Sequence, residues 1–565
     1  MRSRPATTLA VLLAALAAPA SAGAVENLAG EPPFGGTPPP RLKQPASEGR
    51  PPPGFRLSAD QAIAIASRAG PVAAERAQDG TLRPRAFERG ADEWQVDFYA
   101  SGSGKVAEAI VVDADGSVLG AWHDQQLGTP LARGYSGAVA QKVNAPYVWL
   151  LLSVLFVAPF IDPRRPFRAV HADLLVLVGL GASLFFFNRG EITLSVPLTY
   201  PVLGYFVLRM LAAGLWPRER AGPLVPRVPI RWLAWAAVAL AVGRVALNLV
   251  DSHVIDIGVA GVIGAHHIAH GQELYNGAFA PGIDLRGDVY GPFNYLAYLP
   301  FELVWPWHGT WGSVPAAHAA AIAFDLLTAL GLLALGRRLR AGADGRALGV
   351  AMAFAWLACP WTLYAMNANA NDGLVAALAV GAMLALASPA GRGLFIALAA
   401  AAKFGPAALA PLFATATGER RIRSWLVFGV VFALALAALF APFIPGGGIH
   451  ELYDRTLGYQ ASRSSPFSIW GLAPSLDFLR TGVRAGAVLL AVAVAFFPRN
   501  RSAVQVAALA AAVTIAIQLG ATHWFYFSVV WFLPFVLVAS FAELRSIAPV
   551  ELRPAGSEAR PAAAS

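Results

Sequence analysis

The sequence has few of the charged groups that cover the surface of soluble proteins. Asp, Glu, Lys and Arg make up 14% of its 565 residues, against roughly 25% in typical soluble domains. Hydrophobic residues make up 56%, and the mean hydropathy is +0.53. This balance is typical of a protein whose solvent is a lipid bilayer.

Cysteine and lysine are almost absent. The single cysteine, Cys359, leaves no partner for an intrachain disulfide, so cysteine usage carries no information on the redox compartment. Only four of the 43 basic residues are lysines, and Lys403 is the only lysine beyond residue 142. The arginines cluster in short segments between apolar runs, as expected for cytoplasmic loops of a membrane protein. No basic face forms, so nucleic-acid binding is not expected.

The first 56 residues read as an export signal and a spacer. Arg2 and Arg4 precede the apolar run 9–18, and Ala20-Ser21-Ala22 fits a small-residue cleavage site, which predicts a signal peptide over 1–22. An uncleaved anchor is the alternative. Residues 23–56 are rich in proline and glycine and predict an extended linker without a packed core.

Residues 57–127 have the only soluble-domain pattern. The spacing of apolar residues predicts a helix over 57–69, with Ser58 as N-cap and Gly70 as its end. Alternation predicts strands over 94–99, 109–112 and 118–122. A helix followed by a small antiparallel sheet resembles the PepSY domain, which implies a binding or regulatory module. A spacer without a ligand is the alternative, and the partner of this domain is unknown.

Apolar runs dominate the rest of the chain. They predict membrane spans near 146–161, 171–187, 194–215, 232–250, 313–335, 346–364, 372–388, 424–443, 484–497, 502–518 and 523–541. Arginines between them place the N-terminal domain outside the cytoplasm and the tail 546–565 inside it. Two segments do not fit simple crossings. Residues 292–307 must leave and return to the outer side or lie along the surface, and 393–416 must form two half-helices, unless the span count is wrong by one.

Three polar regions share the predicted outer face, namely 251–292, 367–372 and 446–482, with Thr522-His523-Trp524 closing the third. Their order along the chain resembles the GT-C glycosyltransferases, and glycosyltransferase family 87 most closely. The residues that carry the resemblance are Asp256-Ile257-Gly258-Val259, Gly271-Gln272-Glu273-Leu274-Tyr275, Tyr290-Gly291-Pro292-Phe293, Ala402-Lys403-Phe404-Gly405-Pro406, Ser465-Pro466-Phe467-Ser468-Ile469-Trp470-Gly471 and His523-Trp524-Phe525-Tyr526. Gly291 departs from the family, which usually has proline there.

The resemblance implies a GT-C-like core over 232–545, preceded by a three-span bundle over 128–231. It implies inverting transfer of a sugar, mannose-like or other, from a polyprenyl-phosphate donor to an extracytoplasmic glycan or glycolipid, with no cofactor and no metal. The expected fold is a mainly α, polytopic membrane protein with a small α+β extracytoplasmic domain, located in the plasma membrane. A lipid-carrier flippase or transporter is the alternative function, since broken helices also line transport pathways.

Sugar transfer needs a base for the acceptor hydroxyl, and a partly desolvated carboxylate can supply it. The position of Asp256 in the motif makes it the expected base, with Asp251 as the rival. The phosphate of the donor needs cations or hydrogen-bond donors, for which we expect Lys403, Arg463 and His523. Their alternatives are a lysine snorkelling to the interface, an unengaged loop arginine and an aromatic-belt residue.

Other polar and aromatic residues are candidates for contacts with the sugar or the acceptor, because amides both donate and accept and tryptophan stacks on sugar rings. They are Asp251, His270, Tyr290, Asn367, Asn369, Trp470 and Trp524. Capping of a helix that begins near Asp372 is the alternative for the asparagines, and we favour it for Asn371. A position at the headgroup level is the alternative for the two tryptophans, and it is the more common one. His266 and His270 share a helical face, but polar contacts or acceptor binding are expected ahead of metal ligation.

Overall fold

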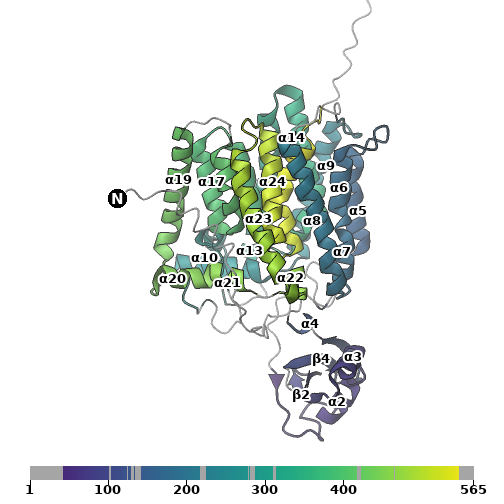
Figure 1. Ribbon diagram of the computed structural model, residues 1–565. Helices are drawn as coiled ribbons and strands as arrows, with labels where there is room; N and C mark the ends of the chain where they lie inside the picture. The colour runs from purple at the N-terminus through teal and green to yellow at the C-terminus, as the bar shows by residue number, and fades with distance from the viewer. Residues whose placement is uncertain are drawn as a thin grey trace, which may run out of the picture.

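The structure is a computed structural model. It describes residues 42–100, 104–123, 125–128, 133, 142–216, 224–277, 279, 287–309, 314–416, 422–463 and 465–545. The expected signal peptide over 1–22 and the tail 546–565 lie outside these residues. The described part consists of a small N-terminal domain and a large bundle of apolar helices (Figure 1).

The N-terminal domain packs two helices on a five-stranded antiparallel sheet with strand order β1-β2-β3-β4-β5. Its elements are β1 (Leu42–Lys43), α2 (Ala59–Ala66), α3 (Gly70–Asp79), β2 (Arg83–Arg89), β3 (Glu93–Tyr99), β4 (Lys105–Val112) and β5 (Val118–His123). Ser58 caps α2 with a complete capping box that includes Gln61. Trp94 lies in the core, and its Nε1–H donates to Asp113 Oδ1 at 3.1 Å. The expected α+β domain is therefore confirmed in outline.

Three details of the N-terminal prediction were wrong. Residues 42–56 are not all linker, because β1 pairs with β2 and Phe55 packs on Trp94. Gly70 does not close the helical region. It begins α3, with proline in the first turn, where a missing N–H costs nothing. Strand β2 was missed because its charged sequence has no apolar alternation.

A short helix, α4 (Gln125–Gly128), leads from this domain toward the bundle. The first half of the bundle contains α5 (Pro146–Val157), η2 (Ala158–Phe160), α6 (Ala169–Gly179), α7 (Gly181–Phe187), α8 (Ile192–Leu215), α9 (Ile230–Val250), α10 (Asp256–Ala269), α11 (Pro292–Leu296), α12 (Leu299–Glu302), α13 (Pro315–Leu339), α14 (Gly342–Ala358) and α15 (Pro360–Asn367). Proline stands in the first turn of several of these helices, where it favours helix initiation.

The second half begins with α16, directly after the asparagine-rich segment 367–371. It contains α16 (Asp372–Leu384), α17 (Pro389–Ala402), η3 (Gly405–Leu409), α18 (Ala410–Ala414), α19 (Ile422–Phe440), η4 (Ala441–Phe443), α20 (Gly448–Tyr453), η5 (Asp454–Gly458), α21 (Tyr459–Ser462), α22 (Ile469–Leu472), η6 (Pro474–Leu476), α23 (Asp477–Phe496), α24 (Ala503–Leu519), η7 (Tyr526–Ser528) and α25 (Val529–Ser540).

Six helical segments among the described residues are long and apolar enough to cross a membrane, and α14 with α15, bent by 57°, makes a seventh if the pair is one span. The other four expected spans coincide with shorter apolar helices. Each expected span thus falls on a helix. The protein has the helices of a multi-pass membrane protein. Helix α19 lies at one edge of the bundle (Figure 1), and only 11% of its most apolar stretch is buried.

The two segments that did not fit simple crossings are both irregular. Residues 292–307 form only the short helices α11 and α12, so they do not cross. The helix in segment 393–416 breaks after Ala402, because the backbone of Lys403 is extended and Pro406 has no N–H to donate to a preceding helical carbonyl. Helix α18 then packs back against α17, so the expected pair of half-helices is present.

The connections between the helices gather at two opposite ends. The backbone of Arg227 donates to Pro159 O at 2.8 Å, Leu224 lies beside Leu544, and the Arg340 guanidinium donates to Leu544 O. These contacts join several helix ends at what we call the arginine-rich end. Helices α10 and α20–α22 and the N-terminal domain lie at the other end, which we call the domain end (Figure 1).

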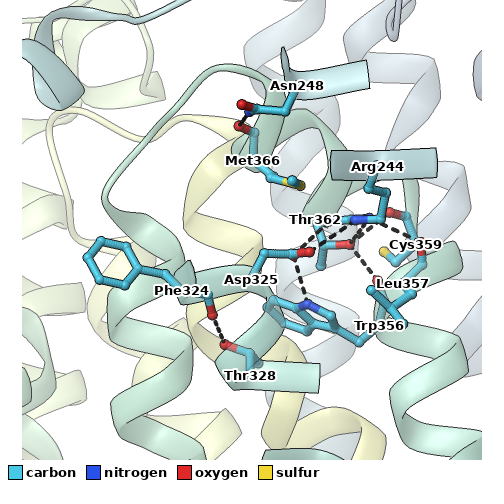
Figure 2. Close-up of polar contacts among 10 residues, drawn as sticks. All are labelled: Arg244, Asn248, Phe324, Asp325, Thr328, Trp356, Leu357, Cys359, Thr362 and Met366. Carbon is cyan, nitrogen blue, oxygen red and sulfur yellow. Dashed lines mark hydrogen bonds and ion pairs between the residues drawn. The ribbon is translucent and has the colours of Figure 1, made fainter. Parts of the chain in front are cut away.

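A buried ion pair joins spans in the middle of the bundle. Arg244 of α9 and Asp325 of α13 lie 2.7 Å apart, and both side chains are under 5% exposed. Trp356 Nε1–H donates to the same carboxylate at 2.9 Å, and the guanidinium donates to Leu357 O at 3.0 Å (Figure 2). Since every charge is paired and hydrogen-bonded, the cluster ties α9, α13 and α14 into one unit.

Candidate functional site

A cavity of about 260 Å³ opens at the domain end of the bundle. Segments far apart in the chain form its walls: the start of α10, the break after α17, the helical segment 457–463 at the end of η5 and in α21, helix α23, and the loop between α24 and η7. Polar and charged groups line one part, whereas the other part is apolar. The apolar lining includes Val289, Leu457, Ala487, Val488 and Ile517.

Asp256 is the first residue of α10, and the stretch before it is fixed by the end of α15. Ile255 N donates to Ala368 O at 3.2 Å, and the Asn369 side chain donates to His253 O at 3.0 Å. Asn369 takes a positive φ of 53°, a conformation that asparagine tolerates better than most residues. Gly258 passes so close to the Asn369 carbonyl that a Cβ there would lie 2.5 Å from it. The start of α10 therefore has a defined position.

A second layer of polar contacts holds this corner from behind. Asn248 Nδ2 donates to Met366 O at 2.8 Å (Figure 2) and to Asn369 Oδ1 at 3.0 Å. His318 Nδ1 lies 3.0 Å from Asn248 Oδ1 and 3.1 Å from Ser252 Oγ. These side chains connect α9, α13 and α15 to the segment that leads into Asp256.

The Asp256 carboxyl is half-buried beside the cavity, and its Oδ1 accepts from Ile257 N at 2.8 Å. Desolvation raises its pKa, and the positive charges of Arg463 and Lys403 act in the opposite direction without cancelling the shift. Tyr290 next to the site has a pKa well above its ordinary value, first because of desolvation and then because of the Asp256 charge. The result is a carboxyl group whose proton affinity is enhanced, near two cations.

Lys403 projects from the break between α17 and η3. Its Nζ lies 2.6 Å from Asp372 Oδ1, and Trp531 Nε1–H donates to the same oxygen at 2.6 Å. The ammonium also lies 5.7 Å from the Tyr290 ring centroid and 5.2 Å from that of Trp531. The helix break therefore delivers a cation whose position is set by a carboxylate and two aromatic rings, and it is not a lysine snorkelling to the interface.

Arg463 and His523 complete the polar part of the cavity. The guanidinium of Arg463 lies 6.0 Å from the Tyr459 ring centroid, on the helical segment before it. His523 Nδ1 lies 2.9 Å from Ser465 Oγ. Desolvation lowers the pKa of His523 well below its ordinary value, and the charges of Arg463 and Lys403 lower it further. This shift favours the neutral form of the His523 ring, which lines the cavity rather than an outer belt.

Of the residues expected to contact sugar or acceptor, Tyr290 and Trp524 line the cavity. Trp470 does not. It is buried elsewhere, where its Nε1–H donates to Leu519 O at 2.9 Å. The expected contact from Trp470 is therefore replaced by a packing role between the 465–472 segment and the end of α24.

The expected sugar contacts from Asn367 and Asn369 do not match their positions. Both are at most 2% exposed, and neither lines the cavity. Asn367 Nδ2 donates to Asp251 O at 2.9 Å. Asn369 Nδ2 donates to Ser252 Oγ at 3.1 Å and to His253 O at 3.0 Å. Their amides are occupied because they fix the loop that carries Asp256. Their contribution to the site is positional.

Asp251, His270 and Asn371 also differ from expectation. Asp251 lies outside the cavity and pairs with Lys142 at 3.1 Å. His270 is exposed, and its Nδ1 faces His266 O at 2.8 Å. Asn371 occupies the N-cap position of α16 without a capping bond, and its amide donates instead to Asn294 at 2.7 Å. Asp251 is therefore not placed to act as the rival base, and Asn371 does not provide the expected cap.

The neighbouring His266 makes the polar contact that we favoured over metal ligation, because its Nδ1 lies 2.8 Å from Glu302 Oε1. Among the described residues no group of three or more His, Cys, Asp and Glu side chains is arranged to hold a metal ion. Glu302, from α12, is buried and was not anticipated as a partner of this histidine.

Sequence reasoning missed the cavity residues Arg484 and Trp531. Asp372 was a candidate for binding sugar hydroxyls, with helix capping as the alternative, but its pairing with Lys403, 31 residues away, was not foreseen. Arg484 lies in α23 and donates to Gly520 O at 2.8 Å. An arginine inside an apolar run is a functional signal in membrane proteins, and that signal could have identified Arg484.

The arrangement therefore gathers a lysine, two arginines, a histidine, the Asp372 carboxylate and an apolar wall around one space, and the carboxyl group of Asp256, whose pKa is raised, lies beside it. Such a site can hold an amphiphilic anion and remove a proton from a group beside it. No protein-family model matches the chain, and no curated protein or solved structure matches it either.

Proposed function

We propose that the protein is an integral membrane glycosyltransferase, which moves a sugar from a polyprenyl-phosphate donor to a glycan or glycolipid acceptor outside the cytoplasm. The single observation that carries the proposal is the convergence of Lys403, Arg463 and His523 on one cavity beside Asp256. These four residues come from separate segments spread over 268 positions, from 256 to 523.

The cation set supports an anionic leaving group. Phosphate oxygens are bound most strongly by charge-assisted hydrogen bonds. Lys403, Arg463 and Arg484 carry positive charge at the cavity, although Asp372 pairs with Lys403, and His523 offers an N–H. A phosphodiester between sugar and lipid becomes a phosphate monoester as the sugar leaves. Preorganised donors stabilise this developing charge more in the transition state than in the ground state.

The apolar part of the lining supports a lipid on that phosphate. Val488 and Ile517 lie on α23 and α24 next to the charged groups, and Val488 is half-buried on a helix with many exposed apolar side chains. An isoprenoid chain leaving the cavity along α23 would therefore pass from protein to bilayer without crossing water. A soluble nucleotide-sugar donor would not need such a wall.

Asp256 is the proposed general base. The acceptor hydroxyl oxygen forms a bond to the anomeric carbon, its proton passes to Asp256, and the bond between that carbon and the phosphate oxygen breaks with its electrons on the phosphate. The products are the glycosylated acceptor and polyprenyl phosphate, and the anomeric configuration inverts. Burial that raises the pKa of Asp256 makes its carboxylate a stronger base near neutral pH.

The test measures release of polyprenyl phosphate from radiolabelled polyprenyl-phosphate mannose by purified protein in nanodiscs, with a membrane lipid and glycan extract as acceptor. Other polyprenyl-phosphate hexoses are assayed in parallel. Asp256→Asn should lower turnover at least about 100-fold, the usual scale of a lost general base. Asp251→Asn is the matched control, because Asp251 lies five residues earlier and outside the cavity, and it should change turnover less than about twofold.

The alternative is a lipid-carrier flippase, which the broken helix at Lys403 would also suit. A flippase needs the anion-binding residues but no base. Full donor turnover by Asp256→Asn would contradict the glycosyltransferase. Movement of polyprenyl-phosphate mannose across proteoliposome membranes without any turnover would favour the flippase.

A further inference from the structure

We propose that Ser465 is a positioning residue that holds His523 as its Nε2–H tautomer, so that the ring donates a hydrogen bond to an anionic group in the cavity. The inference rests on the proposed function only for the identity of that anion, a phosphate on an isoprenoid lipid. Ser465 itself does not line the cavity, and its effect on the ligand passes through the histidine.

The hydrogen bonds around Ser465 indicate where its hydroxyl proton points. Its Oγ accepts from Phe467 N at 3.2 Å and lies 2.9 Å from His523 Nδ1. No other acceptor for the Ser465 hydroxyl is present among the described residues. A hydroxyl oxygen can accept two hydrogen bonds, so the bond from Phe467 N does not by itself set the direction; because Nδ1 is the acceptor within reach, we infer that the hydroxyl proton lies on the line to Nδ1. A ring nitrogen that accepts in this way carries no proton, so in neutral His523 the proton is on Nε2.

The remaining ring nitrogen is open to the cavity. His523 lines that space. Among the described residues nothing is hydrogen-bonded to its Nε2. This atom is also absent from the set of fully buried polar atoms without a partner, so it is accessible. A neutral ring with a protonated Nε2 presents a donor to a ligand there. The lowered pKa of His523 is consistent with this neutral state.

The two segments are locked together by further contacts. Trp524 N donates to Phe467 O at 3.3 Å, and the Phe467 ring packs edge-on against His523 at 5.4 Å between centroids. Ser465 is only 6% exposed, so little of it is open to solvent. On the other side, Gly471 passes directly against the Ser465 carbonyl, where any side chain would collide. These contacts hold the backbone of Ser465 in place beside the ring.

The test uses two probes that share an isoprenoid chain, farnesyl phosphate and farnesol, with binding to the full chain in nanodiscs followed by tryptophan fluorescence. Ser465→Ala should weaken farnesyl phosphate binding about tenfold, the scale of a hydrogen bond to a charged group. It should leave farnesol binding within about twofold. Ser465→Thr, which keeps the hydroxyl, should restore phosphate binding.

A double-mutant cycle separates positioning from a structural role of the turn. His523→Gln supplies an N–H donor whose orientation does not need Ser465, so Ser465→Ala should cost less than about twofold in that background. Ser468→Ala is the matched control, since Ser468 is also buried and its Oγ accepts from Gly471 N at 3.1 Å without touching His523. It should not separate farnesyl phosphate from farnesol.

The inference is overturned if Ser465→Ala weakens both probes equally, or if its cost persists undiminished beside His523→Gln. The binding assay requires no transfer, so the two proposals fail separately. A protein that binds farnesyl phosphate through this pair but never releases polyprenyl phosphate would remove the transferase and keep the inference.

Discussion

The Lys403 ammonium and the Asp372 carboxylate lie 2.6 Å apart, although one follows the break after α17 and the other begins α16. Both side chains are largely buried, with 11% and 4% exposure. Lys403→Met would leave the Asp372 charge buried without its cation. Removing one member of a buried pair is expected to lower the free energy of unfolding by about 3 kcal/mol.

The double variant Lys403→Met with Asp372→Asn removes both charges and should recover most of that stability, because no unpaired charge remains. Thermal unfolding of the purified variants in one detergent gives the comparison. Equal stability of the single and double variants would contradict a coupled pair. Neither variant should bind an anionic lipid as tightly as the unmodified protein, since both lack the lysine.

The raised pKa of Asp256 predicts the pH dependence of turnover. A general base works only when ionised, and ionisation is complete above its pKa in the folded protein. Since that pKa lies above the ordinary value of about 3.8, kcat/KM should fall with decreasing pH on a limb centred above pH 3.8, by up to tenfold per pH unit. The limb should be absent from the residual activity of Asp256→Asn and unchanged in Asp251→Asn. An identical limb in Asp256→Asn would assign it to another group.

Gly291 stands where the family that the chain resembles usually has proline. The structure shows why this position takes a residue without a side chain. A Cβ at this position would overlap the carbonyl of Ala401, two residues before Lys403. Gly291→Ala should therefore force the loop away from α17, with a loss of about 2 kcal/mol or more in stability and weaker binding at Lys403. Gly486→Ala in α23, where nothing lies within 4 Å, should be close to neutral. The readouts are thermal unfolding and farnesyl phosphate affinity.

The orientation of the bundle can be read with single cysteines. The native Cys359 is buried and should react little. In intact cells a membrane-impermeant maleimide should label Gln272→Cys at the domain end but not Arg338→Cys at the arginine-rich end, because both positions are exposed and lie on opposite sides. Permeabilised cells should show labelling of both. The reverse pattern in intact cells would place the cavity in the cytoplasm and contradict an extracytoplasmic reaction.

The helices of the bundle could be predicted from sequence because a bilayer accepts few alternatives to an apolar helix. Even the break at Lys403-Phe404-Gly405-Pro406 carried a local signal, since proline excludes helix continuation. The N-terminal domain was harder. Helix α3 begins at a Gly-Pro pair that also resembles a helix end, and β2 is stabilised by pairing with β1 and β3, partners that a local pattern does not contain.

The charged part of the site was predicted better than its surroundings. Lys403, Arg463 and His523 were expected from chemistry, because a phosphate needs donors. The roles of Asn367 and Asn369 were not, because an amide that binds sugar and one that binds backbone have the same local sequence. Asp372 and Ser465 act through partners 31 and 58 residues away, and such contacts exist only once the chain has folded.

The ion pair between Arg244 and Asp325 has a consequence for how the protein enters the membrane. A lone charge in mid-helix opposes insertion by about 2.5–3.5 kcal/mol, and the two charges are 81 residues apart in the chain. Helix α9 therefore emerges from the ribosome well before α13 can neutralise it. Its retention at the translocon until its counter-charge arrives would make the two helices a single unit of biogenesis.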